Sequence, residues 1–214
     1  MSSILDLLGS DMGKQLIGGA SAQTGQSPDK TATVLSMALP ALMGAMKRNA
    51  STPEGAKNLN NALEDNRHDG SILDKLGGLL GGGGADSSLM NDGAGILSHV
   101  LGGNQSKVEN NISRASGVDS NSVGQIIKMA APVLMGLLGN KKRKENVQEG
   151  GIGSLLGSFL GNSSGSQSII ESLLDSDGDG SVLDDIAGMF TGGDDKKDGD
   201  NGGIGGMLGG MFGK

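Results

Sequence analysis

Two long apolar runs dominate the hydrophobic pattern of the chain. Residues 33–46 and residues 125–138 carry apolar side chains on every side of a helical projection, so each run predicts an α-helix that is buried all round. The two runs align at an offset of 92 residues, which places Pro40 on Pro132 and matches a Leu-Met-Gly triplet in both copies. Each apolar run is too short to cross a bilayer. We predict that they form paired central helices of one helical core.

The repeat extends beyond these runs and predicts two duplicated helical units. At the same offset, Ile4 is matched by Ile96 and Gly25 by Gly117. Each unit therefore predicts a short helix, a longer helix, a glycine that ends it in the left-handed conformation, and the buried helix. The proline inside each buried helix predicts a kink shared by both copies. No stretch alternates apolar and polar residues with a period of two, so the predicted fold class is all-α.

A second offset reveals an insertion in the second unit. A cap and proline at Thr52 predict a further helix in the first unit, and the segment 65–74 recurs as 175–184, at an offset of 110 residues. The difference of 18 residues (110 − 92) places an insertion near residues 141–160. The predicted organisation is helical unit 1 over 1–80, a glycine-rich linker over 81–93, a diverged helical unit 2 over 94–190 and a disordered tail over 191–214. The two units are expected to pack as one compact body or to form two linked lobes.

Composition narrows the function classes. The 214 residues include 41 glycines, three aromatic residues (all Phe) and no cysteine, and the formal net charge is −7. The absence of cysteine excludes disulfides and thiolate metal sites. The acidic balance and the scarcity of stacking side chains argue against a nucleic-acid partner. The N-terminus lacks the pattern of a secretory signal, so we expect a cytoplasmic protein.

Three segments of the first unit carry a resemblance to a known family. They are residues 38–45, residues 49–55 and residues 68–74. With these, the chain resembles the bacterial family called domain of unknown function 937, most strongly over about residues 4–80, and the second unit to about residue 190 looks like a diverged copy. The resemblance implies a helical fold and a prokaryotic source. It implies no activity.

The acidic loop over residues 175–186 is the best chemical candidate. Calcium loops place oxygen ligands at positions 1, 3 and 5, a glycine at 6 and a backbone carbonyl at 7. The chain fills these five places with Asp175, Asp177, Asp179, Gly180 and Ser181. Position 12, which should carry a carboxylate, is Ile186, and Asp185 precedes it. The candidate metal ligands are Asp175, Asp177, Asp179, Ser181 and Asp185.

The equivalent loop of the first unit argues for a simpler interpretation. It has Arg67 where the acidic loop has Asp177, and a cation cannot serve as a calcium ligand. Both loops share only Asp-Gly-Ser before an apolar turn, which is a signal for the start of a helix. We therefore favour a turn and helix cap, with calcium binding as the alternative.

The remaining polar motifs are interpreted as structural. His68 could form half of an acid–base pair with Asp69, but no serine or cysteine accompanies them at the spacing of a catalytic triad. His99 is expected on a helix face. The basic run 141–144 follows a predicted helix, where cations suit the helix dipole, although a nucleic-acid or anionic-lipid patch is the sharper hypothesis.

These observations predict a non-catalytic interaction or scaffolding protein, with a calcium-binding module as the alternative and no enzyme. No cofactor is expected apart from calcium. A protein partner or self-association is expected, and the glycine-apolar tail over residues 204–214 suggests a contact with a second copy or a membrane surface, against a solvated tail without a role.

Overall fold

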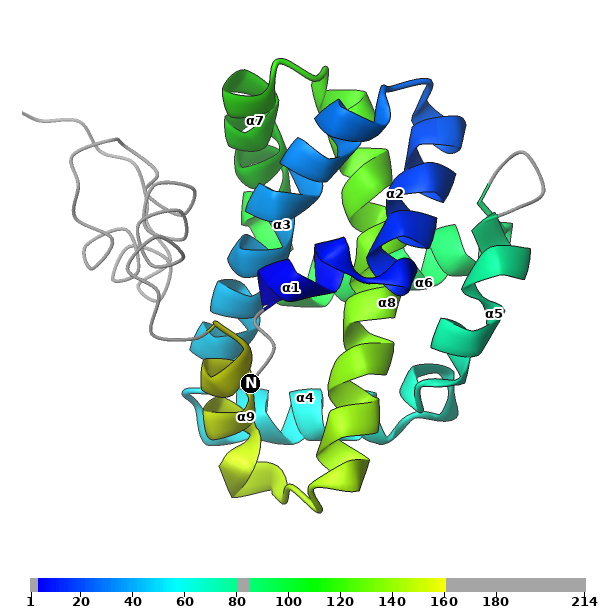
Figure 1. Cartoon of the computed structure of the whole chain (residues 1–214). Helices are drawn as coiled ribbons and strands as arrows, with labels where there is room; N and C mark the ends of the chain where they lie inside the picture. The colour runs from blue at the N-terminus through cyan, green and yellow to red at the C-terminus, as the bar shows by residue number, and fades with distance from the viewer. Residues whose placement is uncertain (1–3, 81–84, 161–214) are drawn as a thin grey trace, which may run out of the picture. The chain divides into compact units, whose positions relative to one another are not determined.

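The computed structural model of the protein describes residues 4–80 and 85–160, and these residues form an all-α fold (Figure 1). The acidic loop and the tail lie outside the described residues. In chain order the elements are α1 (Ile4–Gly9), α2 (Asp11–Thr24), α3 (Pro28–Asn49), α4 (Pro53–Glu64), η1 (Asn66–His68), α5 (Ser71–Leu80), α6 (Ser87–Leu101), η2 (Gly102–Asn104), α7 (Gln105–Ser116), α8 (Ser120–Lys144), η3 (Glu149–Gly151) and α9 (Ile152–Leu160). The predicted fold class is confirmed.

Side-chain caps start the helices where the sequence predicts them. The Ser27 hydroxyl accepts a hydrogen bond from the Lys30 amide at 3.3 Å at the start of α3, and Thr52 caps α4 in the same way. The Asp119 carboxylate accepts from the Ser122 amide at 2.9 Å at the start of α8. Each cap satisfies an amide that has no partner within its helix.

Two glycines end helices in matching places. Gly25 follows α2 with a φ of 68°, and Gly117 follows α7 with a φ of 65°. Only glycine adopts this left-handed conformation without a steric cost, so the chain can turn sharply from each helix into α3 or α8. The order of helix, glycine and buried helix thus recurs at the predicted offset of 92 residues. Superposition of the two units stays a prediction.

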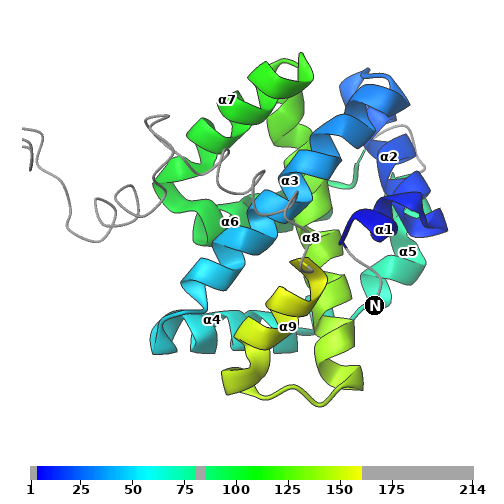
Figure 2. The same ribbon diagram turned by 60° about the vertical axis from the view of Figure 1, so that its left-hand side comes forward.

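The helices α3 and α8 form the centre of the core. Leu42 is 1% exposed and Leu134 is 0% exposed. The helix α8 contacts α2, α4 and α5 of the first unit as well as α6 and α7 of the second, so the described parts of the two units form one body and not two lobes (Figures 1 and 2). Pro40 and Pro132 are both buried, and each helix continues past its proline, to Asn49 and Lys144.

The helix α8 is longer than its apolar run suggests. It has 25 residues, because the polar residues on either side of residues 125–138 continue the helix, so the expectation that it is too short to span a bilayer is wrong. It is the one helix within the described residues that is long and apolar enough to do so, and 83% of its most apolar window is buried inside the fold. Within this fold α8 is a core helix.

The predicted linker over 81–93 is wrong beyond residue 86. Asp86 caps α6, whose first residue is Ser87, so residues 87–93 are helical. The physical reason is visible at Gly93, where an added Cβ would lie 1.8 Å from the backbone oxygen of Lys128 on α8. This glycine permits close helix packing and does not loosen the chain. The first helix of the second unit is consequently longer than the next, 15 residues against 12, contrary to the predicted order.

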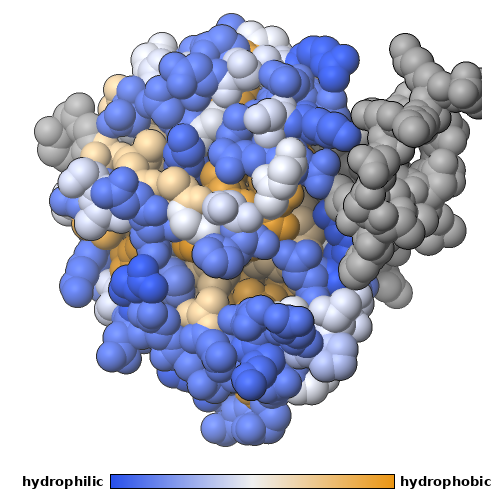
Figure 3. All heavy atoms as spheres, turned by 180° about the vertical axis from the view of Figure 1, so that it is seen from behind, coloured by the Kyte–Doolittle hydropathy of each residue, from blue (hydrophilic) through white to orange (hydrophobic). Residues whose placement is uncertain are grey.

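One face of the described fold gathers hydrophobic side chains. Seen from behind, they lie in the middle of the face and are surrounded by hydrophilic residues (Figure 3). Several apolar residues are only partly buried against the core, among them Met12, Met37 and Met90. Hydrophobic residues scattered singly over a surface need no explanation, whereas a gathered group points to a contact surface.

Leu134→Ala is expected to lower the free energy of unfolding by about 2–5 kcal/mol, because the truncation leaves a cavity in the core. Urea melts monitored by circular dichroism measure the change. The exposed Lys30→Ala on α3 is the control, with an expected change within about 0.5 kcal/mol. A loss below about 1 kcal/mol for Leu134→Ala would show that the site collapses around the smaller side chain or is not in the core.

Candidate functional site

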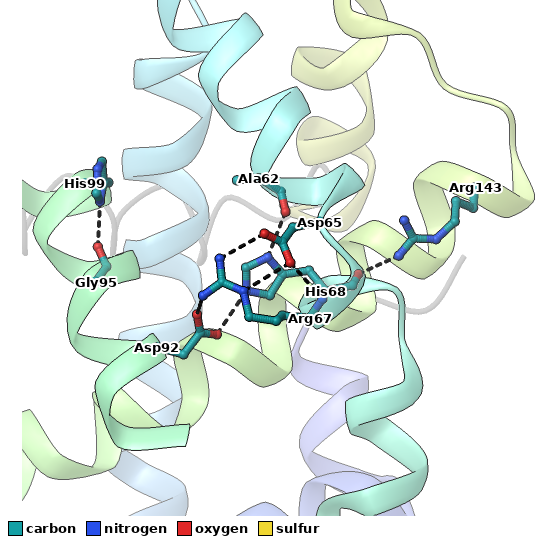
Figure 4. A network of polar contacts seen from close by, with 8 residues as sticks. All are labelled: Ala62, Asp65, Arg67, His68, Asp92, Gly95, His99 and Arg143. Atoms are coloured by element: carbon teal, nitrogen blue, oxygen red, sulfur yellow. Dashed lines mark hydrogen bonds and ion pairs between the residues drawn. The ribbon is translucent and has the colours of Figure 1, made fainter. Parts of the chain in front are cut away.

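Polar side chains gather where η1 meets the helices α6 and α8 (Figure 4). The backbone of η1 lies directly against α8: a Cβ added to Gly139 would be 2.0 Å from the His68 carbonyl oxygen. The chain then turns into α5 at Gly70, whose φ is 96°. A glycine on each side of the contact therefore brings the two backbones together.

His68 is buried, at 3% exposed, and both of its ring nitrogens face oxygen atoms. Nδ1 lies 2.7 Å from the Ala62 carbonyl oxygen, and Nε2 lies 3.0 Å from Oδ2 of Asp92 on α6. A carbonyl oxygen only accepts, so Nδ1 carries a hydrogen. Nε2 lies within hydrogen-bond distance of the Asp92 carboxylate. His68 therefore links the end of α4 to α6 through its two ring nitrogens.

Arg67 covers this pair from the solvent side. Its Nη1 donates to Oδ1 of Asp92 at 2.7 Å, and its Nη2 donates to Oδ2 of Asp65 at 2.9 Å. Hydrogen bonds from the Arg67 side chain and amide hold the pKa of Asp65 well below its usual range, and Asp65 in turn raises the pKa of Arg67. The Arg67 side chain is 65% exposed, whereas the Asp92 side chain is only 16% exposed. Solvent therefore screens the charge of Asp92 less than that of Arg67.

The basic end of α8 completes the network from the opposite side. Arg143 donates to the carbonyl oxygens of His68 at 2.7 Å and Leu63 at 3.1 Å. Lys142, which is buried, donates to Glu64 at 2.8 Å and lowers the pKa of that carboxyl group. The bond to Leu63 satisfies a carbonyl group in the last turn of α4, where the helix itself offers no partner, and the bond to His68 satisfies the last carbonyl group of η1. Three contacts of the basic run thus join the second unit to the first.

Lys141 is also engaged. It pairs with Glu145 one turn further along and lies over the Phe159 ring, 5.6 Å from its centroid. The structural interpretation of the basic run therefore accounts for Lys141, Lys142 and Arg143, without recourse to a nucleic acid or a lipid.

The structure does not unite the histidines that the sequence singled out. His99 is exposed on α6 and its Nδ1 lies 2.8 Å from the Gly95 carbonyl oxygen of the same helix. The partner of His68 is Asp92, not the neighbouring Asp69. Asp92 was missed because it falls in the segment assigned to the linker, and no local signal links residues 24 positions apart.

Asp69 instead caps α5, as the turn-and-cap interpretation predicts for the first unit. Its carboxylate accepts from the Ser71 amide at 2.7 Å, and the hydrogen bonds from Ser71 lower the pKa of Asp69. The second copy of this loop lies outside the described residues, so the proposed calcium ligands Asp175, Asp177, Asp179, Ser181 and Asp185 have no place in the geometry above.

The network is suited to holding helices together rather than to proton transfer. A general base needs a nitrogen lone pair within reach of a substrate, and His68 is buried with both nitrogens already in contact with oxygen. Among residues 4–80 and 85–160, no three His, Cys, Asp or Glu side chains are grouped as they would be to hold a metal ion. The arrangement links α4 and η1 of the first unit to α6 and α8 of the second.

One protein family matches the chain. The model of the family described as bacterial protein of unknown function (DUF937) matches residues 6–141 and 144–214, which is nearly the whole chain. The chain belongs to the DUF937 family. The resemblance seen in the first unit is confirmed, and it covers the second unit and the tail of this DUF937 protein as well. Neither the curated proteins nor the solved structures gave a match.

Asp92→Asn is expected to lower the free energy of unfolding of the DUF937 protein by about 1–3 kcal/mol. The amide offers one acceptor where the carboxylate offered two, so either His68 or Arg67 loses its partner in a mostly buried site. Urea melts measure the loss. Asp11→Asn is the matched control, because Asp11 is exposed and pairs with Lys14 at 3.6 Å; its effect should stay within about 0.5 kcal/mol. Equal effects of the two substitutions would contradict a structural role for the network.

Proposed function

We propose that this DUF937 protein is a non-catalytic interaction or scaffolding protein that acts in the bacterial cytoplasm. The main observation in support of this proposal is the group of hydrophobic side chains on one face of the fold, surrounded by hydrophilic residues (Figure 3). Such a gathered group is typical of protein contact surfaces.

The polar network supports a structural role. Its histidine, arginines and carboxylates are occupied in contacts between helices, and both ring nitrogens of the buried His68 already contact oxygen atoms. A fold that presents hydrophobic side chains on one face suits a scaffold. The partner is another protein or a second copy of the chain, and the net charge of −7 disfavours nucleic acid.

The tail offers a second means of association. Its last eleven residues, 204–214, contain five apolar side chains at helical spacing, separated by glycine pairs. Glycines spaced four apart allow helices to approach closely, and the apolar side chains suit a second copy or a membrane surface.

Deletion of residues 193–214 tests the association. We expect the far-ultraviolet circular dichroism of the remaining helices to persist, while light scattering over a concentration series shows smaller oligomers than the full chain forms. Vesicles of anionic lipid added before centrifugation test the membrane surface, and the full chain should pellet more than the deletion variant. If both chains are monomers at every concentration and neither pellets, the tail has no part in association.

Calcium binding is the second candidate, favoured by the sequence of the acidic loop. Three aspartates and a glycine occupy positions 1, 3, 5 and 6 of a calcium loop, and the oxygen ligands suit that ion. The first copy of the loop provides the natural control, because Arg67 occupies position 3 and Asp69 is already bound to Ser71.

If the acidic loop binds calcium, calorimetry should show heat for the native chain and for Asp69→Ala, but none for Asp177→Ala. The reason is that Asp177 supplies a ligand at position 3, while Asp69 acts as a helix cap. The titration should extend to about millimolar calcium, the weak end of the range for such loops. Absence of heat in the native chain would exclude this candidate and leave the helix-cap interpretation.

A further inference from the structure

A buried cation on α8 depends on a carboxylate that is open to solvent. The side chain of Lys142 is 9% exposed and that of Glu64 on α4 is 57% exposed, and Nζ of the lysine lies 2.8 Å from Oε1 of the glutamate. A charge that is withdrawn from water needs an opposite charge to compensate it, so Lys142 needs Glu64 in order to stay buried. Glu64 gains less from the pair, because solvent screens its charge. The dependence is therefore one-sided.

Asn60 depends on the same carboxylate. It lies one turn before Glu64 on α4, its side chain is buried, and its Nδ2 donates to Oε1 of Glu64 at 3.2 Å. Its Oδ1 is buried without a hydrogen-bond partner among the described residues. Loss of the charge on Glu64 would thus leave the ammonium group of Lys142 buried and unpaired, and it would also weaken the bond that orients the Asn60 amide.

The helix α4 has a small apolar contact with the core. Of its 12 residues, only Leu59, Asn60 and Leu63 are buried, whereas α8 is buried along most of its length. An element with few buried apolar side chains opens at a lower free-energy cost than the core does. Local release of α4 is therefore the least costly way for the fold to return Lys142 to water.

The groups around Glu64 favour its ionised form. Hydrogen bonds from Lys142 and Asn60 lower the pKa of Glu64, and the positive charges of Lys142 and Arg143 on α8 lower it further. The resulting stabilisation is complete above the ordinary pKa of glutamate, and it is lost as the pH falls through the lower pKa of the folded state. Among the other elements packed against α4, α9 has no charged side chain, and the remaining charged groups are Lys47 and Arg48 at the end of α3, Arg67 and His68 on η1, and Glu149 on η3.

From this geometry we propose that the pair of Glu64 and Lys142 is an acid-sensitive latch that holds α4 on α8. Protonation of Glu64 leaves the charge of Lys142 buried and unpaired, and α4 then detaches while the core around α3 and α8 stays folded. The release exposes Leu59 and Leu63, which are buried in the closed fold. The latch is a property of the fold and does not depend on the proposed scaffolding function, so either can fail without the other.

Glu64→Gln imitates the protonated carboxyl group at neutral pH. In the full chain, hydrogen exchange followed by mass spectrometry should show α4 exchanging several-fold faster in this variant than in the native protein, with α3 unchanged. Glu54→Gln is the control, because Glu54 is exposed in the first turn of the same helix. Adding Lys142→Met to Glu64→Gln should restore the native rate, since no buried charge then remains. Equal rates for Glu64→Gln and Glu54→Gln would overturn the latch, and a double variant as fast as Glu64→Gln would overturn the role of Lys142.

Acidification of the native chain tests the trigger. Nile red, an uncharged dye that fluoresces on hydrophobic surfaces, should bind at a pH where far-ultraviolet circular dichroism still shows the helices. The Lys142→Met chain should bind the dye only at a lower pH, because it has no buried charge to compensate. Dye binding that begins only as the helices are lost, or at the same pH in both chains, would overturn the acid sensitivity. Unfolding of the whole Glu64→Gln chain at neutral pH would overturn a release confined to α4.

Discussion

The contact between the backbone of α8 and the carbonyl group of His68 is the constraint on which the rest of the described fold depends. It exists because Gly139 has no side chain, so the helix can lie directly against the turn η1. This approach places Arg143, at the basic end of α8, within hydrogen-bond distance of the carbonyl groups of Leu63 on α4 and His68 on η1, and it places His68 next to α6. The hydrophobic core supplies most of the driving force for folding. The close contact fixes which face of each helix meets the other unit.

The contact of His68 and Asp92 depends on the hydrogen bonds around it. Burying the Asp92 carboxylate costs free energy that only good hydrogen bonding repays, and Arg67 and His68 provide these bonds here. Loss of one partner is more harmful than loss of both, because the remaining charge is left buried and unpaired. In this fold Asp92 joins α6 to η1, because its carboxylate contacts both His68 and Arg67.

Local signals in the sequence predicted the elements better than the contacts between them. The caps at Ser27, Thr52 and Asp119 and the glycines after α2 and α7 act on neighbouring residues, and the sequence places each correctly. Glycine inside a helix was the main source of error, because the sequence alone does not separate a flexible linker from a close helix contact. Gly93 belongs to the second kind, and assigning it to a linker also concealed Asp92, the partner of His68.

The two copies of the loop illustrate how a repeated sequence motif can change its chemistry. The first copy directs a cation toward Asp92 on α6, whereas the second carries three aspartates in its corresponding segment. Calcium would need about six to eight oxygen ligands, so most of those carboxylates would have to bind the ion. A helix cap needs only one carboxylate that accepts from a backbone amide, as Asp69 does in the first copy. The loop 175–186 lacks the carboxylate at position 12 that calcium loops use, and a helix cap requires none there. The residues that leave the calcium motif incomplete are therefore compatible with a helix cap.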